Sequence, residues 1–187
     1  MPADQPAPNS TKIAESLVLL EFVADLYPEA NLLPKDPVLR AKVRFFIDVV
    51  SNKFNPGYFG YVITGKATQA DLIKGFKDIQ ALLPEKGFAV GEWSIADAAI
   101  APFIARMFVA LENDLGMYAV GEGPKTLEII KTSPELARIS QYIQYLTSRQ
   151  SFIDTFDPVC AFARCSDRKS TRLNSSHSGE SRMPSSA

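Results

Sequence analysis

The stretch TKIAESLVLLEFVADLYPEANLLPKDPVLRAKVRFFID, residues 11–48, decides the architecture that we expect for this chain. Apolar residues recur at mostly helical spacing over residues 15–27, and a proline ends that run. Further prolines among polar residues then favour extended backbone over residues 28–37, which indicates a connector between two packed units. Asp36 is a suitable N-cap with proline at the next position, so a long amphipathic helix is predicted from there to residue 53.

The rest of the chain is predicted to be helical as well. Residues 54–61 hold four aromatic side chains among prolines and glycines, so the long helix is expected to break or bend there. Further helices are expected at residues 68–83, 94–114, 133–146 and 151–156, whereas residues 121–124 are interpreted as a turn. Strand signals are nearly absent, so the predicted fold class is an all-α bundle.

Composition excludes several classes of function. The 20 basic and 21 acidic residues leave a net charge of −1, which gives no indication of a nucleic-acid partner or an anionic membrane. We find no apolar run of membrane-spanning length and no signal-peptide pattern, so a cytoplasmic protein is expected. Cys160, Cys165 and His177 are too few for a four-ligand zinc site, so no metal is predicted. The two cysteines are interpreted as having no functional role.

The end of the chain differs sharply in composition from the rest. Residues 159–187 are predicted to be a disordered tail, because from residue 167 the sequence is rich in serine and lacks aromatic residues. The string DRKSTRLNSSH followed by ESRMPSSA resembles the conceptual translation of a sequencing adapter. Residues 167–187 are therefore interpreted as not native, with a natural serine-rich tail as the alternative.

Residues 11–48 resemble the join between the two halves of cytosolic glutathione transferases, and most closely that of the fungal omega-like group. The resemblance covers roughly residues 4–158. It implies a glutathione-transferase-type C-terminal helical domain at residues 38–158 and an inter-domain linker at 31–37. Residues 1–30 then correspond to a remnant of a thioredoxin-like N-terminal domain, comprising the end of its last strand and its third helix.

The resemblance also implies a glutathione site. Glu15 and Ser16 match the acidic–serine pair that holds the γ-glutamyl end of glutathione in this family. The chemistry agrees, because amide donors and a hydroxyl at a helix N-terminus suit a carboxylate. An ordinary helix start, for which glutamate and serine are also favoured, is the alternative.

Two further sets of residues follow from the resemblance. The first is a candidate wall for the hydrophobic co-substrate pocket, with plain core packing as the alternative: Tyr58, Phe59, Tyr61, Arg106 and Met107. The second is the segment SIADAAIAP, residues 94–102, which resembles the N-capping box of the family's central buried helix. There the Ser94 hydroxyl is expected to accept from the amide of residue 97, and the Asp97 carboxylate from the amide of Ser94.

The function implied by the resemblance is glutathione-dependent transfer in a parent enzyme that is a homodimer. The reaction is conjugation of glutathione to a hydrophobic electrophile, or omega-like thioltransferase and deglutathionylation chemistry on a mixed disulfide. The family's catalytic Cys, Ser or Tyr is expected upstream of residue 1, so the chain is interpreted as N-terminally truncated and inactive as written. A non-enzymatic protein-interaction module with a glutathione-transferase-like helical domain is the alternative.

Overall fold

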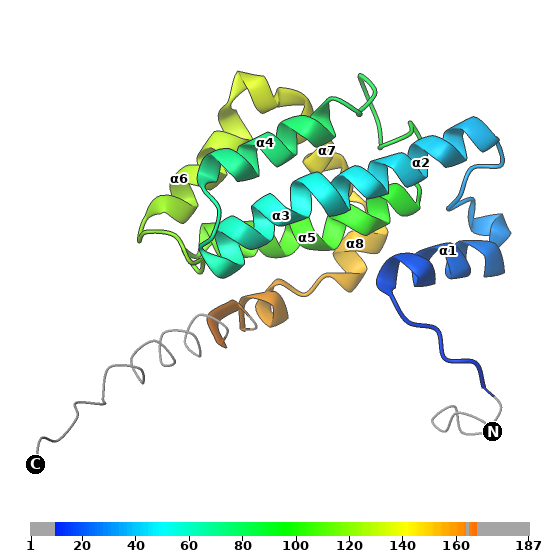
Figure 1. The fold of residues 1–187 in the computed structure, drawn as a ribbon, viewed down its shortest axis with the longest axis horizontal. Helices are drawn as coiled ribbons and strands as arrows, with labels where there is room; N and C mark the ends of the chain where they lie inside the picture. The colour runs from blue at the N-terminus through cyan, green and yellow to red at the C-terminus, as the bar shows by residue number, and fades with distance from the viewer. Residues whose placement is uncertain (1–9, 164, 168–187) are drawn as a thin grey trace, which may run out of the picture.

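The computed structural model describes residues 10–163 and 165–167, and it confirms the all-α class (Figure 1). In chain order the elements are α1 (Ser16–Leu26), η1 (Pro28–Ala30), α2 (Pro37–Val49), η2 (Val50–Phe54), α3 (Asn55–Tyr58), η3 (Phe59–Thr64), α4 (Gln69–Gln80), α5 (Ile95–Glu112), α6 (Glu122–Thr132), η4 (Pro134–Leu136), α7 (Ala137–Ser148) and α8 (Gln150–Thr155). Extended pairing in the described ranges is limited to two isolated bridges within residues 88–92. None of the helices so described is both long enough and apolar enough to cross a membrane.

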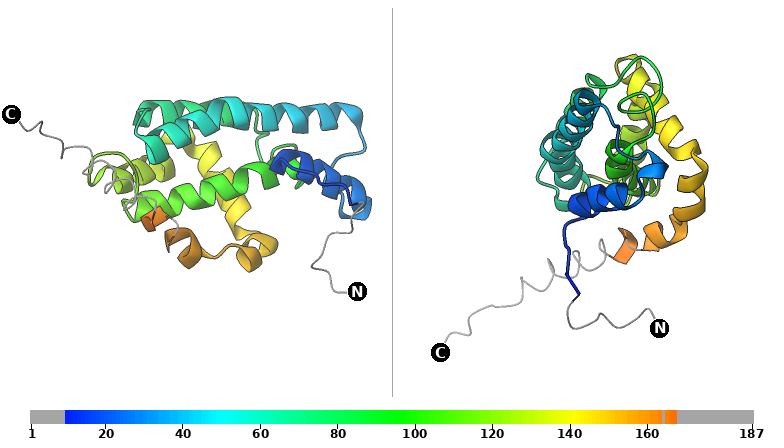
Figure 2. Two further views of the ribbon diagram at one scale, coloured as in Figure 1. Left: turned by 60° about the horizontal axis from the view of Figure 1, so that its bottom comes forward. Right: turned by 90° about the vertical axis from the view of Figure 1, so that its right-hand side faces the viewer.

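The helix predicted to break or bend at residues 54–61 does not break: it continues, with a change to π-helical turns at Val50–Phe54 and Phe59–Thr64. Elements α2, η2, α3 and η3 follow one another as a single rod from residue 37 to residue 64 (Figures 1 and 2). Val50, Asn55 and Phe59, at the junctions, all keep right-handed helical dihedrals. Pro56 has no N–H to donate, and the π-helical turns on either side of it keep the rod continuous.

Two glycines allow the rod to pack very closely on α4. A Cβ atom on Gly57 would lie 2.8 Å from the Asp71 carbonyl oxygen, and one on Gly75 would lie 3.0 Å from the Phe54 Cα. Any side chain at Gly57 would therefore force the two helices apart. Gly57 had suggested a helix break in the sequence, but here it serves close helix packing.

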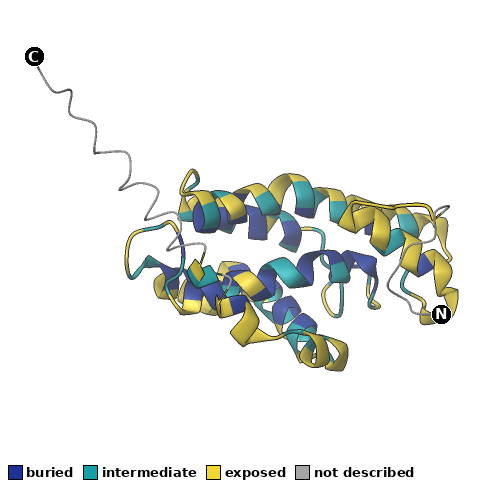
Figure 3. Cartoon of the chain, turned by 90° about the horizontal axis from the view of Figure 1, so that it is seen from below, coloured by how far each residue is buried: buried dark blue, intermediate teal, exposed yellow. Residues whose placement is uncertain are grey.

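The long helix α5 runs through the centre of the bundle, and Figure 3 shows buried residues along most of its length. It begins with the capping box of Ser94 and Asp97. The Asp97 carboxylate accepts from the amide of Ser94 at 2.9 Å, and also from the Ala89 amide at 2.9 Å and the Tyr142 hydroxyl at 2.7 Å. Burial raises the pKa of Asp97, and these hydrogen bonds oppose that shift.

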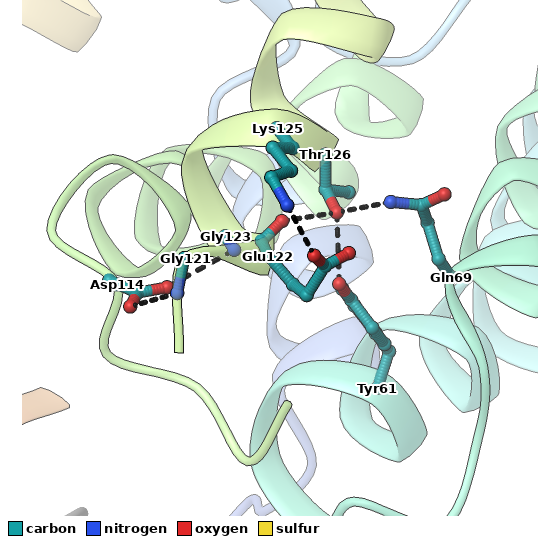
Figure 4. Close-up of polar contacts among 8 residues, drawn as sticks. All are labelled: Tyr61, Gln69, Asp114, Gly121, Glu122, Gly123, Lys125 and Thr126. Carbon is teal, nitrogen blue, oxygen red and sulfur yellow. Dashed lines mark hydrogen bonds and ion pairs between the residues drawn. The ribbon is translucent and has the colours of Figure 1, made fainter. Parts of the chain in front are cut away.

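Helix α6 was missed, because residues 121–124 had been interpreted as a turn. Its start is fixed by the Asp114 carboxylate, which accepts from the Gly121 amide at 2.7 Å and from the Gly123 amide at 3.1 Å (Figure 4). Gly121 adopts φ 86°, a left-handed conformation that glycine reaches without strain. The cap therefore comes from a residue outside the helix, and no local capping pattern marks it.

A buried hydroxyl then ties α6 to the rest of the bundle (Figure 4). Thr126 is fully buried, and its hydroxyl donates to the Glu122 carbonyl oxygen at 2.7 Å. The same hydroxyl lies 2.9 Å from the Tyr61 hydroxyl and accepts from the Gln69 side-chain amide at 2.6 Å. One threonine thus links α6 to η3 and α4, which lie far from it in the sequence.

The C-terminal region departs from the expected disorder over its first residues. Residues 158–163 and 165–167 are helical, so the prediction that disorder begins at residue 159 is wrong there. The Asp157 carboxylate caps this turn by accepting from the amides of Val159 and Cys160 at 2.8 and 3.1 Å. The predictions for residues 168–187, including His177, lie outside the described residues.

Candidate functional site

Helix α1 places an almost entirely apolar segment against only one side of the bundle (Figures 2 and 3). Ala24 is its only buried residue. Leu20 is partly buried against the core, and the other six large apolar side chains are between 37% and 54% exposed: Leu17, Val18, Leu19, Phe22, Val23 and Leu26. Two hydrogen bonds of 2.9 Å join the Arg44 guanidinium of α2 to the Glu21 carboxylate of α1. Contacts on one side therefore hold a helix whose other sides remain apolar and exposed.

The start of α1 is open to a ligand. Glu15, at the N-cap position, has φ 73° and ψ 117°, and no side chain caps the first turn. The first turn also contains no acidic residue. The first amides of a helix lack intrahelical partners and carry a partial positive charge, so this end can hold an anionic group.

A cavity of about 510 Å³ lies between α1, the rod and α5. Its lining is mostly apolar and comprises Ser16, Leu17, Leu19, Leu20, Val23, Ile47, Val50, Ser51, Asn55, Ala98, Ala99, Pro102, Phe103 and Arg106. Ser16 belongs both to the open start of α1 and to this lining. The arrangement therefore joins a site for an anionic group to an apolar chamber.

A second cavity, of about 430 Å³, lies on the other side of Arg106. It runs between α5 and α8, and it shares Ala98, Pro102 and Arg106 with the first cavity. The side chain of Arg106 is in the exposed class and makes no hydrogen bond or ion pair with any residue that the structure describes. It is therefore a cation available to a ligand at the border of the two cavities.

The structure does not bring the five predicted wall residues together. Three of them lie in the core, namely Tyr58 at 4%, Tyr61 at 6% and Met107 at 0% exposure. Phe59 is 39% exposed and packs edge-on against Phe103 at 5.8 Å between ring centroids, without lining the cavity itself. Arg106 alone of the five lines both cavities, because successive residues of a helix such as α5 point in different directions.

Sequence reasoning missed the rod's contribution to the cavity. Ile47, Ser51 and Asn55 line the same wall, and they stand at positions i, i+4 and i+8. That helical spacing was a usable signal, but the expected break at residues 54–61 concealed it. The buried Oδ1 atom of Asn55 has no hydrogen-bond partner among the described residues.

The described part of the chain contains two cysteines and a number of Asp and Glu side chains. No group of three or more His, Cys, Asp or Glu side chains within it is placed to hold a metal ion. Cys160 and Cys165 form no disulfide, and neither lines either of the two cavities.

The described residues thus form an all-helical bundle in which an apolar cavity lies beside a helix start that lacks a side-chain cap, an arrangement suited to a small molecule with an anionic end. No family model matches the chain. Crystal structures give the clearest likeness, and glutathione transferase Omega 1C from Trametes versicolor is 46% identical with a TM-score of 0.86. That match covers 91% of this chain and 71% of the Omega 1C chain. The chain belongs to the glutathione transferase family.

Two other relatives bear on the site. The structure of glutathione transferase Omega 2S from Trametes versicolor in complex with 2,4-dihydroxybenzophenone is 38% identical, has a TM-score of 0.74, and covers 95% of this chain and 72% of its own. Glutathione S-transferase U26 of Arabidopsis thaliana is 29% identical over 89 residues. That match spans 45% of this chain and 40% of the plant protein.

Proposed function

We propose that this chain is the larger part of a glutathione-dependent transferase of the omega-like kind. Residues 38–158 form its helical domain, residues 31–37 the linker, and residues 1–30 the end of a thioredoxin-like domain. The exposed apolar sides of α1 support this division. A helix that is apolar on all sides is normally buried, so α1 is suited to contact with the body of such a domain. The whole enzyme is expected to be a cytoplasmic homodimer.

Glutathione is assigned to the start of α1, where Glu15 and Ser16 hold its γ-glutamyl end. The open amides and the Ser16 hydroxyl suit the ligand's carboxylate, and the Glu15 carboxylate suits its ammonium group. The backbone of Glu15 supports the assignment, because φ 73° with ψ 117° lies outside the regions that L-residues favour. Such strain costs about 1–3 kcal/mol per residue and is typical of ligand-binding positions.

The hydrophobic co-substrate is assigned to the cavity between α1, the rod and α5. In this assignment Arg106 remains a pocket residue, as the sequence predicted, and Leu20 and Phe103 join it in the pocket wall. Tyr61 and Met107 belong to the core instead. The related Omega 2S structure is a complex with 2,4-dihydroxybenzophenone, an aromatic compound, and this supports an aromatic co-substrate. The single observation that carries the proposal is the continuity of this chamber with Ser16 at the open start of α1.

Two reactions fit this arrangement. In conjugation, the glutathione thiolate attacks an electrophilic carbon, a carbon–sulfur bond forms, and the leaving group departs with its electron pair. In thioltransferase chemistry, a thiolate attacks one sulfur of a mixed disulfide and the other sulfur leaves as a thiolate. Both reactions need the thiol deprotonated, so we assign the residue that lowers its pKa to the thioredoxin-like half rather than to Cys160 or Cys165.

Calorimetric titration with glutathione tests the proposal. We expect weak or no binding by the 187-residue chain, and binding with conjugating activity when it is joined to the thioredoxin-like half of the Omega 1C enzyme. Ser16→Ala in the joined protein should weaken glutathione binding by about tenfold, the equivalent of one lost hydrogen bond to a charged group. Ser148→Ala, a change at an exposed serine that lines neither cavity, is the matched control. If the joined protein folds but does not bind glutathione, the non-enzymatic interaction module becomes the better interpretation.

A further inference from the structure

The two cavities beside α5 share one cation and have no anion of their own. Among the residues that the structure describes, Arg106 is the only charged side chain that lines either cavity, and no Asp or Glu side chain lines them. Ala98, Pro102 and Arg106 stand at positions i, i+4 and i+8 on one face of α5, and all three border both cavities. The lining of these cavities therefore offers no acidic side chain to balance the charge of Arg106.

Folding does not explain this arginine. Arg106 is exposed and makes no hydrogen bond or ion pair with any described residue. Arg138, by contrast, donates to the carbonyl oxygens of Pro84 and Gly87 at 2.6 and 2.8 Å and so joins two parts of the fold. A change at Arg106 should therefore leave stability almost unaltered, which makes the residue a clean target for mutation.

The cavities and the cation set different requirements for a ligand. Volumes of about 510 and 430 Å³ are within the range of sites for small organic molecules, and both linings are mostly apolar. The guanidinium of an arginine matches a carboxylate, which can accept two parallel hydrogen bonds from it. Together these features describe an amphipathic ligand that has an apolar body and a carboxylate.

We propose that Arg106 is a specificity-determining residue, which makes the enzyme prefer a co-substrate with a carboxylate over a neutral one of the same shape. The apolar body of the co-substrate lies in the cavity between α1, the rod and α5, and its carboxylate accepts hydrogen bonds from Arg106. This inference rests on the proposed function for the location of the co-substrate. It goes beyond that function by making the co-substrate an organic anion, whose carboxylate is bound and takes no part in the reaction.

Two probes of nearly equal shape and different charge test the proposal directly. Equilibrium binding of 2-naphthoate and of 2-naphthamide to the 187-residue chain is measured by calorimetry at low salt and without glutathione. We expect the carboxylate to bind about fivefold more tightly, as a charge pair at an exposed arginine predicts. The preference should shrink at high salt. In Arg106→Gln the ratio of the two affinities should fall to about one.

Matched variants separate recognition by Arg106 from a general effect of charge. Lys86→Gln removes one positive charge at an exposed position that lines neither cavity, and it should keep the wild-type ratio. Arg106→Lys keeps the charge but loses the planar fork of donors, so it should retain only part of the preference.

Turnover by the joined protein gives a second readout. Glutathione conjugation is measured with 4-chloro-3-nitrobenzoate and with 4-chloro-3-nitrobenzamide. Arg106→Gln should raise KM for the benzoate about fivefold and leave kcat for both compounds nearly unchanged, because the carboxylate is held equally in the ground state and the transition state. A fall in kcat for both compounds would mean that Arg106 acts on the reaction itself, contrary to the proposal.

Several binding results would also overturn the proposal. They are equal binding of both probes by the wild-type chain, binding of neither probe, or an unchanged affinity ratio in Arg106→Gln. If Arg106→Gln weakens glutathione binding by the joined protein and leaves the probe ratio unchanged, Arg106 holds a carboxylate of glutathione and not of the co-substrate. If the joined protein does not bind glutathione but the probe ratio holds, the proposed function fails and the preference for a carboxylate stands.

Discussion

Helices α1 and α5 are both built from apolar residues, yet they have opposite surroundings. In α5, 12 of 18 residues are buried, whereas in α1 only Ala24 of 11 residues is buried. Apolar composition therefore shows which helices need to pack against other elements, and the structure shows whether such packing is present. For α5 the cover is the rest of the bundle. For α1 the described part of the chain provides a cover on one side.

The two helix starts differ in the same way. Helix α5 begins with a buried capping box, whereas α1 begins with a strained Glu15 and no side-chain cap. The first arrangement satisfies the helix from within the fold, and the second leaves donors for a ligand. We interpret α5 as the structural centre of the molecule and α1 as its functional edge. Four predictions test this contrast.

The largest effect is expected at the start of α5. Asp97→Ala removes the acceptor for the amides of Ala89 and Ser94 and for the hydroxyl of Tyr142, all in the core. We expect the free energy of unfolding in urea to fall by about 4 kcal/mol, because several buried donors lose their partner together. Asp71→Ala, in the solvent-exposed capping box of α4, should cost much less. Equal losses would mean that burial does not strengthen the α5 box.

The second-largest effect is expected from truncating apolar side chains, which should cost much more stability in α5 than in α1. Ile100→Ala in α5 removes a side chain of 0% exposure and should lower the unfolding free energy by about 3 kcal/mol. Leu26→Ala in α1, where the side chain is 54% exposed, should change it by less than about 0.5 kcal/mol. Urea unfolding at two protein concentrations gives both values. A large, concentration-dependent loss at Leu26 would show that a second copy of the chain covers α1.

A buried polar contact outside α5 should have an intermediate effect. Thr126→Val leaves the Gln69 amide without its acceptor and disturbs the Tyr61 hydroxyl, so we expect a loss of about 1–2 kcal/mol in unfolding free energy. Thr132→Val, at an exposed position in the same helix, changes a hydroxyl that bonds only the Glu128 carbonyl, and should be nearly neutral. Similar losses of unfolding free energy at both positions would mean that the buried hydrogen bonds of Thr126 contribute no more to stability than an exposed one.

The smallest effect concerns the attachment of α1. The hydrogen bond from Arg44 lowers the pKa of Glu21, so this carboxylate stabilises the fold above its unfolded pKa of about 4.3. The stabilisation is lost as the pH falls through the lowered pKa. The difference in unfolding free energy between the wild type and Glu21→Gln should therefore be largest near neutral pH and vanish in acid. It should also shrink at high salt, and a difference that stays the same from neutral pH into strong acid would contradict the assignment.

The sequence supplied most of the helices, because apolar periodicity and capping residues are local signals. It correctly placed α1, the starts of the rod and of α4, and the capping box at Ser94 and Asp97. Helix α6 was not predicted because its capping residue, Asp114, lies outside the helix. The continuity of the rod was not predicted, because a proline such as Pro56 normally indicates a helix break. In the structure, π-helical turns on either side of Pro56 continue the helix.

The site was less predictable than the fold. Its location follows from the packing of α1, the rod and α5 against one another, and residue spacing within one helix does not reveal that packing. Of the predicted wall residues, Arg106 lines the cavity, whereas Tyr58, Tyr61 and Met107 lie in the core. Asn55 was missed because only tertiary structure shows that a polar side chain is buried and unpaired.

The close contact at Gly57 and Gly75 has a mechanical consequence for ligand selection. Because α3 and α4 meet backbone to backbone there, the wall that carries Asn55 is braced from behind and has little freedom to shift. The opposite wall, α1, is attached by two exposed ion pairs, the buried Ala24 and the partly buried Leu20. The cavity therefore has one closely packed wall, the rod, and one more loosely attached wall, α1. We expect differences in ligand size to be accommodated by movement of α1 and not of the rod.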